Sequence, residues 1–304
     1  MKSPIEFRLD NDEPVITYTS PSRHFGNLRE ELNNDAVRVY NKYGPCYLAY
    51  SSGIDCQIIL RSWLDMNCEV FPFFVYFKGY NTDELEAVKY SEKFYGIKID
   101  IIEVDIEQHR NTWEQMRIVE NNPTLIHYPF DYASQQLKED FPVVLSGPSE
   151  PCPIGVDEYQ GTAIYHNIDS TMLLRCKAMN KHREVLDFPY SYASLASYYC
   201  DDIMKAYIDS SRFFVLNGLL KDGEPLPSTV RYEYYAKPLI KARYYKKDIF
   251  YPSKKTGIEK FPSWMITDWE YPEKYRVTAP YWDVVKHLES CDGTIKEYRD
   301  WMFK

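Results

Sequence analysis

The feature that most limits the fold of this chain is the alternation of short apolar runs with helical patterns between residues 46 and 147. The apolar runs are too short for helices, and each is bounded by turn residues, which is typical of buried strands. We expect strands at 46–50, 69–77, 97–105 and 142–147, and helices at 55–66, 81–96, 107–119 and 130–139. Strands that alternate with helices in this way form a parallel sheet with helices on both faces. The sequence therefore predicts an α/β fold with a doubly wound, mostly parallel sheet.

A further helix is expected immediately before the first of these strands. In the stretch NLREELNNDAVRVYNKYG, apolar residues recur at helical spacing from Leu28 to Val39, and Gly44 follows as a stop signal. In the helix expected at 81–96, Asn81 and Glu84 stand at the spacing of a capping box. Residues 1–25 contain many turn formers and are interpreted as a lead-in arm.

The sequence changes in character near residue 150, where turn residues crowd the stretch GPSEPCPIGVDEYQG. Helical patterns are expected near 168–182, 191–207 and 208–220, and a region rich in proline and lysine follows them. We divide the chain into an N-terminal arm and helix (1–45), a nucleotide-binding α/β domain (46–155) and a mainly helical C-terminal portion (156–304). We expect this C-terminal portion to pack on the ligand site.

The loop after the first strand carries the clearest chemical signal, in the stretch YLAYSSGIDCQIIL. A loop at the carboxyl end of a parallel strand presents unpaired backbone N–H groups and the positive end of the next helix dipole. Small residues such as Ser51, Ser52 and Gly53 let a phosphate approach the backbone. Asp55 would repel a phosphate unless a divalent cation lies between them, so it suggests Mg²⁺. The alternative is an ordinary turn in which Asp55 merely stabilises the helix start.

This loop resembles the PP-loop of the N-type ATP pyrophosphatase superfamily, whose pattern is S-G-G-x-D-S. The superfamily includes asparagine synthetase, GMP synthetase, NAD synthetase and 7-cyano-7-deazaguanine synthase. Its members cleave ATP between the α- and β-phosphates, adenylate an oxygen of the substrate, and let a nitrogen or sulfur nucleophile displace AMP. Ser51, Gly53 and Asp55 match the pattern, whereas Ser52 replaces a glycine and Cys56 replaces the final serine.

Other segments resemble the asparagine-synthetase-like members in the same order, over residues 40–265. The stretch VVLSGPSEP matches their VLLSGDGADE segment at Ser146 and Gly147, and Glu150 is the nearest replacement for its acidic residues. Lys255 falls at the position of a lysine that reaches the ATP phosphates. The resemblance thus implies an adenine-nucleotide α-hydrolase-like fold that uses ATP and Mg²⁺.

The resemblance also implies roles for individual residues. Asp55 and Lys255 would be catalytic, and Asp55 and Glu150 would ligate Mg²⁺. The residues that would hold the nucleotide are Ser51, Ser52, Gly53, Ile54, Asp55, Cys56, Val75, Phe77, Ser146 and Gly147. Within this set, the backbone near Val75 and Phe77 would hold adenine. An acidic residue at the position of Glu150, and a lysine in a run such as that of Lys255, can equally be solvated surface groups.

Composition limits the partners and the compartment. A net charge of −9 and a pI near 5.3 argue against general nucleic-acid binding, because attraction to phosphates needs a positive face. No apolar run approaches the ~20 residues that a membrane helix needs, and the first residues do not resemble a signal peptide. The 7 cysteines are spread widely without a C-x-x-C pair, so we expect a reduced, cytoplasmic protein.

Two functions are compatible with these features. The first is an enzyme that adenylates a small acidic or nucleobase-like substrate and then forms an amide or C–N bond, with release of AMP and pyrophosphate. Nothing before residue 46 resembles the glutaminase domain of asparagine synthetases, so ammonia would come from solvent, a partner chain or an amine substrate. The second is a degenerate PP-loop protein that binds nucleotide, or acts as a structural or interaction protein, without turnover. A relative of the phosphoadenylylsulfate reductases is disfavoured, because their C-terminal cysteine motif is missing.

Overall fold

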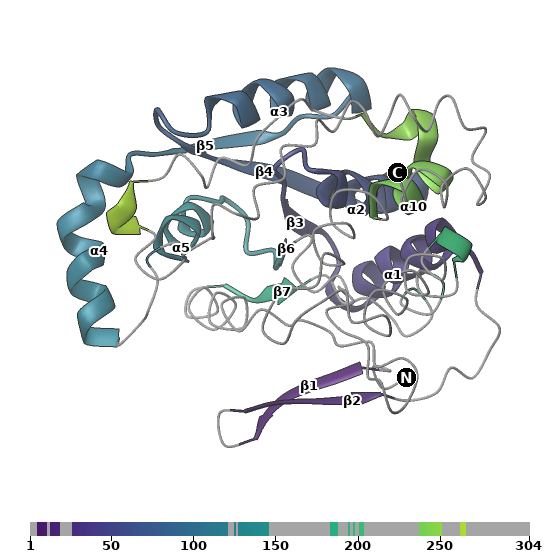
Figure 1. Cartoon of the computed structure of the whole chain (residues 1–304), viewed down its shortest axis with the longest axis horizontal. Coiled ribbons are helices and arrows are strands. Elements are labelled where there is room, and N and C mark those ends of the chain that lie inside the picture. The colour runs from purple at the N-terminus through teal and green to yellow at the C-terminus, as the bar shows by residue number, and fades with distance from the viewer. Residues whose placement is uncertain are drawn as a thin grey trace, which may run out of the picture.

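The structure of the 304-residue chain is a computed structural model. The structure describes residues 5–10, 13–18, 26–120, 125, 127–145, 183–187, 194, 197, 201–203, 237–250 and 262–265. Two sheets and several helices make up these residues (Figure 1).

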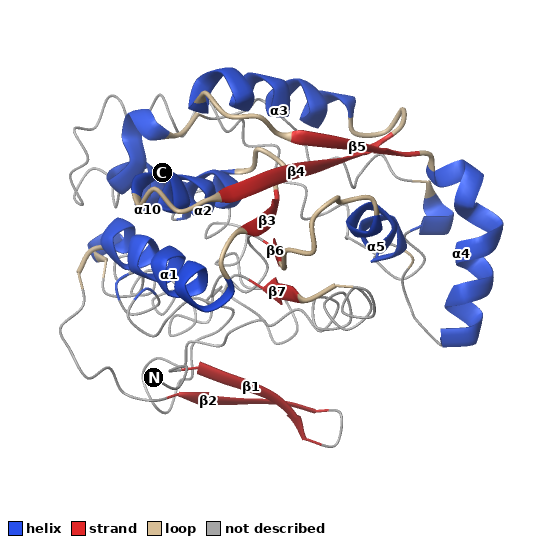
Figure 2. Ribbon diagram, turned by 180° about the vertical axis from the view of Figure 1, so that it is seen from behind, coloured by secondary structure: helices blue, strands red, loops and turns tan. Residues whose placement is uncertain are grey.

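The larger sheet has five parallel strands in the order β5-β4-β3-β6-β7. These strands are β3 (Cys46–Ala49), β4 (Val70–Phe77), β5 (Asp100–Val104), β6 (Val143–Leu145) and β7 (Val185–Asp187). Figure 2 shows them as one row from β5 to β7. The parallel order confirms the predicted α/β fold with a doubly wound sheet, because the chain runs from β3 towards β5 on one side and continues through β6 and β7 on the other.

The helices cover both faces of the sheet. They are α1 (Leu28–Tyr43), α2 (Ile54–Asp65), α3 (Thr82–Tyr95), α4 (Ile106–Glu120), α5 (His127–Gln135) and α10 (Lys237–Tyr245), with short 3₁₀ turns at η2 (Lys246–Asp248) and η4 (Ser263–Met265). Successive strand residues point to opposite faces. Thus Leu48 packs in the core formed with α1, α2, α3 and α10, whereas Tyr47 packs in the core formed with α4 and α5.

Helix α2 is buried on nearly all sides. Its buried residues include both apolar and polar side chains, namely Ile54, Cys56, Gln57, Ile58, Ile59, Leu60, Ser62 and Trp63. A helix with this much buried surface needs partners around it. The sheet, α1 and α10 are these partners, so α2 lies between the strands and a helix that is far away in the sequence.

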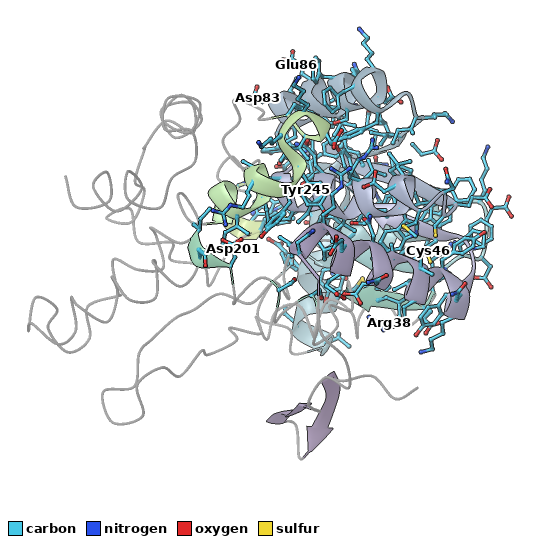
Figure 3. The ribbon with its side chains drawn as sticks, turned by 90° about the vertical axis from the view of Figure 1, so that its right-hand side faces the viewer. Arg38, Cys46, Asp83, Glu86, Asp201 and Tyr245 are labelled. Carbon is cyan, nitrogen blue, oxygen red and sulfur yellow. The ribbon has the colours of Figure 1, made fainter. Side chains whose placement is uncertain are left out.

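Arg29 of α1 joins three elements on this side of the sheet. Its guanidinium donates to Asp65 at the end of α2 (Nε to Oδ2, 2.8 Å) and to Asp248 of η2 (Nη1 to Oδ2, 2.6 Å). It also donates to the backbone carbonyl of Tyr244 and lies 5.1 Å from the centre of the Tyr245 ring. Tyr245 itself is 1% exposed and sits among packed side chains (Figure 3). Arg29 therefore fixes α10 and η2 against α1 and α2.

Several predicted elements differ from those observed. Residues 5–10 and 13–18 of the expected arm form an antiparallel hairpin, β1 (Ile5–Asp10) and β2 (Glu13–Tyr18). Strand β7 was not expected and extends the main sheet within the portion described as mainly helical. The helices expected at 168–182 and 208–220 lie outside the described residues, and within 191–207 residues 194, 197, 202 and 203 are helical.

The capping box predicted at Asn81 and Glu84 is wrong. Asn81 precedes α3, but its side chain makes no capping bond to the helix. It donates instead to the carbonyl of Val75 and accepts from the N–H of Phe77. These backbone groups of β4 lie beyond the end of β3, so β3 does not pair with them. A complete capping box occurs at α1, between Asn27 and Glu30.

Candidate functional site

The loop between β3 and α2 lies at the point where the sheet reverses its strand order. Strand β3 pairs with β4 on one side and with β6 on the other, and Ala49 is opposite both Phe73 and Leu145. The carboxyl ends of β3 and β6 therefore lie side by side at one edge of the sheet. Open α/β sheets bind their ligands at such a switch point. The structure places Ser51, Ser52, Gly53 and Asp55 there, as the sequence predicted for the loop and the first turn of α2.

The tight turn of this loop is made by Ser52 and not by Gly53. Ser52 has φ 57°, in the left-handed region, whereas Gly53 has φ −61°. A side chain at Gly53 would meet only the Ser51 Oγ atom, at 3.5 Å, which is an ordinary contact. A non-glycine residue in the left-handed region is unfavourable by ~1–2 kcal/mol. Ser52, which replaces a glycine of the PP-loop pattern, thus keeps the backbone conformation that glycine adopts most readily.

Two hydroxyl groups of the loop have polar neighbours within it. The Ser52 hydroxyl donates to the Ser51 carbonyl at 2.6 Å and is fully buried. The Ser51 Oγ atom lies 3.4 Å from the Cys56 thiol in the first turn of α2. The residue that replaces the final serine of the pattern therefore contacts the first serine across the loop.

Asp55 forms an ion pair with Lys241 of α10. The Lys241 side chain has no exposed surface, while that of Asp55 is 25% exposed. Asp55 also lies in the first turn of α2, where the helix dipole favours a negative charge. The carboxylate that the sequence suggested as a Mg²⁺ ligand is thus paired with a protein cation from the C-terminal portion.

The strand edge expected to hold adenine already has a partner within the chain. The Asn81 Oδ1 atom accepts from the Phe77 N–H at 2.7 Å, and its Nδ2 atom donates to the Val75 carbonyl at 3.0 Å. The Tyr50 N–H donates to the Phe73 carbonyl, so the backbone groups of Phe73 point towards β3. The backbone groups of Val75 and Phe77, two and four residues further along β4, point to the same side. Asn81 therefore continues the ladder of β3 past the end of that strand.

The remaining predicted site residues lie outside the described part of the chain. They are Ser146, Gly147, Glu150 and Lys255. Across the described residues, no group of three His, Cys, Asp or Glu side chains is placed to hold a metal ion. None of the helices in those same residues has both the length and the apolar character needed to cross a membrane.

Sequence reasoning missed two buried polar residues beside the loop, Lys241 and Gln57. Lys241 and Tyr245 share one face of α10, being four residues apart, and Tyr245 is buried. Gln57 interrupts the apolar stretch CQIIL of a helix that is buried on nearly all sides. In both cases a polar residue stands on an apolar face, and that pattern is the signal that could have identified them.

Burial sets the ionisation of several groups in the core that packs on β3. It raises the pKa of the Tyr50 hydroxyl well above its ordinary value, and the same effect acts on the Tyr95 hydroxyl. Burial, with a smaller effect from the charge of Glu184, raises the pKa of the Cys46 thiol on β3 to about 11. These groups are therefore neutral near pH 7 and act as hydrogen-bonding or apolar groups.

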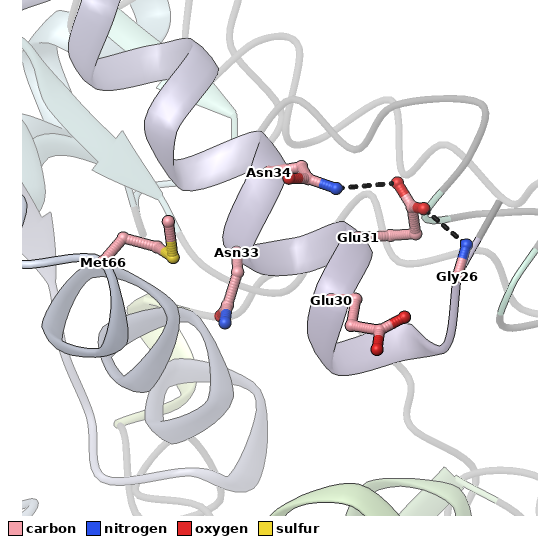
Figure 4. Close-up of a pocket in the computed structure, with 6 residues that line it drawn as sticks. All are labelled: Gly26, Glu30, Glu31, Asn33, Asn34 and Met66. Atoms are coloured by element: carbon pink, nitrogen blue, oxygen red, sulfur yellow. Dashed lines mark hydrogen bonds between the residues drawn. The ribbon is translucent and has the colours of Figure 1, made fainter. Parts of the chain in front are cut away.

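A hollow of about 470 Å³ lies elsewhere, at the start of α1 (Figure 4). It is lined by Gly26, Glu30, Glu31, Asn33, Asn34 and Met66. The Glu31 carboxylate is used within this lining, since it accepts from the Gly26 N–H and from the Asn34 amide. Met66 follows the C-terminal end of α2, a helix of 12 residues that is about 18 Å long. The hollow is thus at the opposite end of α2 from the loop.

The fold and the loop together define an α/β protein with a doubly wound parallel sheet and a strand–loop–helix site at its switch point. No protein-family model and no curated protein sequence matches the chain. Solved structures with some likeness include the predicted subunit of a tRNA methyltransferase from Methanocaldococcus jannaschii (13% identity, 50% of this chain and 71% of that chain, TM-score 0.30). Others are the NH3-dependent NAD synthetase from Campylobacter jejuni (14%, 75% and 97%, TM-score 0.33) and the glutamine-dependent NAD+ synthetase from Acinetobacter baumannii in complex with ADP (16%, 83% and 51%, TM-score 0.35). All three TM-scores are below 0.5, so the fold is assigned from the sheet itself and no function is argued from these likenesses.

Proposed function

We propose that this chain binds ATP at the loop between β3 and α2 and uses it to adenylate a small substrate. AMP and pyrophosphate would be released when a nitrogen nucleophile displaces AMP to form an amide or C–N bond. The observation that carries the proposal is the position of the loop Ser51–Ser52–Gly53 at the switch point, directly before the N-terminus of a buried helix. Free N–H groups and the positive end of the dipole at such a helix start attract phosphate. The resemblance of the loop to the S-G-G-x-D-S pattern supports pyrophosphate as the group that is held.

The Asp55 carboxylate fits a magnesium ligand, since Mg²⁺ in nucleotide sites is commonly held by one or two carboxylates together with phosphate oxygens. Its ion pair with Lys241 would then have to open or be shared. Magnesium would neutralise the pyrophosphate as it leaves. Glu150 and Lys255 remain the expected second ligand and phosphate-binding lysine, and the substrate is expected to be acidic or nucleobase-like, with an amine or ammonia as donor.

The test measures AMP formation from α-labelled ATP with Mg²⁺ and a panel of amino acids, nucleotides and ammonia. Removing Asp55 alone would take the carboxylate from a buried lysine, so loss of activity could reflect unfolding. We therefore compare wild type, Lys241→Met and the double variant Asp55→Asn/Lys241→Met, which removes both charges of the pair. Asp83→Asn is the matched control, because Asp83 is an exposed carboxylate in the first turn of α3.

The proposal expects AMP formation by wild type and by Asp83→Asn, and none by the folded double variant. If wild type neither binds ATP nor forms AMP with any member of the panel, the proposal is wrong. Equal AMP formation by the wild type and the double variant would show that Asp55 has no role in the reaction.

A second candidate function is nucleotide binding without turnover. The observation that favours it is the ion pair of Asp55 with a fully buried lysine, which places a protein cation beside the expected magnesium ligand. Ser52 and Cys56, which replace residues of the active pattern, point the same way. Tight binding of ATP or AMP without AMP release, under conditions in which the protein is folded, would support this function over the first.

A further inference from the structure

Gln57 of α2 is a fully buried polar side chain. It forms hydrogen bonds to the loop between β3 and α2 and to two residues that pack beside that loop. Its Nε2 atom donates to the Ser52 carbonyl at 2.8 Å and to the Phe250 carbonyl at 2.8 Å. Its Oε1 atom accepts from the Tyr95 hydroxyl at 2.9 Å and from the Phe250 N–H at 2.8 Å. A glutamine amide has two donors and one acceptor oxygen with two lone pairs. Gln57, which is 0% exposed, therefore uses its whole capacity.

These partners also fix the orientation of the amide. The carbonyls of Ser52 and Phe250 can only accept, and the Phe250 N–H can only donate. A flipped amide would place oxygen against two carbonyls and an NH₂ group against an N–H. An unsatisfied buried polar group costs ~1–3 kcal/mol, so a single orientation is strongly preferred and the groups around it are held in one arrangement.

The partners of the Gln57 amide lie in three different parts of the protein. Ser52 is the residue with positive φ that shapes the loop. Phe250 follows η2, and both its N–H and its carbonyl are paired with the one side chain, as a neighbouring strand would pair them. The Phe250 ring packs against Tyr90, Phe94 and Tyr95 of α3, with ring centres 4.8, 5.4 and 6.4 Å away. Gln57 thus connects the loop, α3 and the chain that leaves α10.

We propose that Gln57 is the positioning residue of the nucleotide site. It fixes the Ser52 carbonyl, and with it the left-handed turn of the loop, to the backbone of the C-terminal portion at Phe250. This inference rests on the proposed function, and it assigns Gln57 no contact with nucleotide or substrate. A residue of this kind changes the affinity of the site by changing the population of the binding conformation.

The experiment measures ATP affinity by calorimetric titration in folded protein, well below the unfolding temperature. Gln57→Met keeps the length of the side chain and removes all four hydrogen bonds, two of which hold the loop and the Phe250 carbonyl. The matched control is Tyr95→Phe, which removes one bond to the same Gln57 and leaves the bond to Ser52 intact. We expect Gln57→Met to weaken ATP binding about tenfold to a hundredfold, and Tyr95→Phe to change it less than about threefold.

A second variant covers the case in which Gln57→Met does not fold. Gln57→Glu keeps the two acceptor bonds to Tyr95 and Phe250 but turns an oxygen towards the two carbonyls. Protonation of the introduced carboxyl restores one donor. The affinity of Gln57→Glu relative to wild type at the same pH is therefore expected to recover as pH is lowered, whereas a purely structural role would change stability and leave the affinity of the folded protein unchanged.

The outcomes separate this inference from the proposed function. If wild type binds ATP and the folded Gln57 variants bind it equally well, the positioning role is overturned. If wild type binds no nucleotide, the proposed function is wrong, and hydrogen exchange decides about Gln57. Faster exchange of the amides from Ser52 to Asp55 in a Gln57 variant than in Tyr95→Phe would then support positioning of the loop, and equal exchange would overturn it.

Discussion

The ion pair between Asp55 and Lys241 predicts that its two members are unequal in their effect on stability. Asp55→Asn takes the carboxylate from an ammonium group with no exposed surface, whereas Lys241→Met leaves a carboxylate that is 25% exposed. Methionine keeps most of the packing of the lysine stem. We therefore expect Asp55→Asn to lower the free energy of unfolding more than Lys241→Met does.

The burial of each group sets the magnitude. Removal of one partner of a buried pair costs ~3–5 kcal/mol, because the other charge stays buried. This full range applies to Asp55→Asn. After Lys241→Met the Asp55 carboxylate still meets water and the N-terminus of α2, and such a helix start stabilises a negative charge by ~0.3–1 kcal/mol. We expect a loss of about 1–2 kcal/mol for Lys241→Met, and a double variant that is more stable than Asp55→Asn alone.

The measurement is urea unfolding of wild type, the two single variants and the double variant, followed by tryptophan fluorescence. Urea is preferred because guanidinium chloride screens ion pairs. The four free energies form a double-mutant cycle, which gives the interaction between the two side chains directly. Equal destabilisation by Lys241→Met and Asp55→Asn would contradict the unequal burial of the two charges, and so would a double variant that loses the sum of the two single losses.

Three further predictions concern the loop, the contact with α10 and alkaline pH. Ser52→Val should lower the free energy of unfolding by ~2 kcal/mol because a β-branched residue resists φ 57°, while Ser52→Gly should change it by less than ~1 kcal/mol; urea unfolding measures both. Arg29→Met should lower the free energy of unfolding by about 1–3 kcal/mol. Arg29→Lys should restore less than half of this loss, because one ammonium group cannot form the forked contacts to Asp65 and Asp248. Equal stability of Arg29→Lys and wild type would contradict this prediction. Burial raises the pKa of Cys46 from 9.0 to about 11, so between these values the unfolded chain binds fewer protons than the folded protein. Stability should fall there by roughly 1 kcal/mol for each pH unit, and Cys46→Ala should remove this part of the slope in unfolding measured from pH 8 to pH 12.

The central sheet could be predicted because its signals are local. Short apolar runs bounded by turn residues, alternation in one of them, and helical spacing between them are read along the chain, and they identified β3, β4, β5 and β6 with the helices that connect them. Strand β7 has only 3 residues and gives no periodic pattern. The hairpin at residues 5–18 does carry alternation at Ile5, Phe7 and Leu9, but the turn residues around it favoured an irregular arm.

The candidate site could be predicted only in part, because its contacts join distant segments. The loop itself was identified from a few consecutive residues. Its partners were not, since Lys241 is 186 positions from Asp55 and Phe250 is 193 positions from Gln57. Asn81 shows the converse, because its spacing to Glu84 is right for a capping box, yet its side chain bonds to the end of β4 on the side where β3 has already ended. Local spacing states what a residue can do, and the tertiary neighbours decide what it does.

The charge of Lys241 bears on whether the Asp55 carboxylate needs a metal ion beside a bound phosphate. A carboxylate beside a phosphate site needs a cation, and at about 4 Å and an effective dielectric constant near 20 two like charges repel by ~4 kcal/mol. In the folded chain Lys241 pairs with Asp55, so phosphate at the proposed site would meet a neutralised carboxylate with or without magnesium. Lys241→Met removes this neutralisation. In the proposed site its ATP affinity should therefore depend on magnesium at least about tenfold more than that of wild type, when each is titrated with ATP in Mg²⁺ and in EDTA. Equal dependence in the two proteins would show that Lys241 does not set the charge that the phosphates meet.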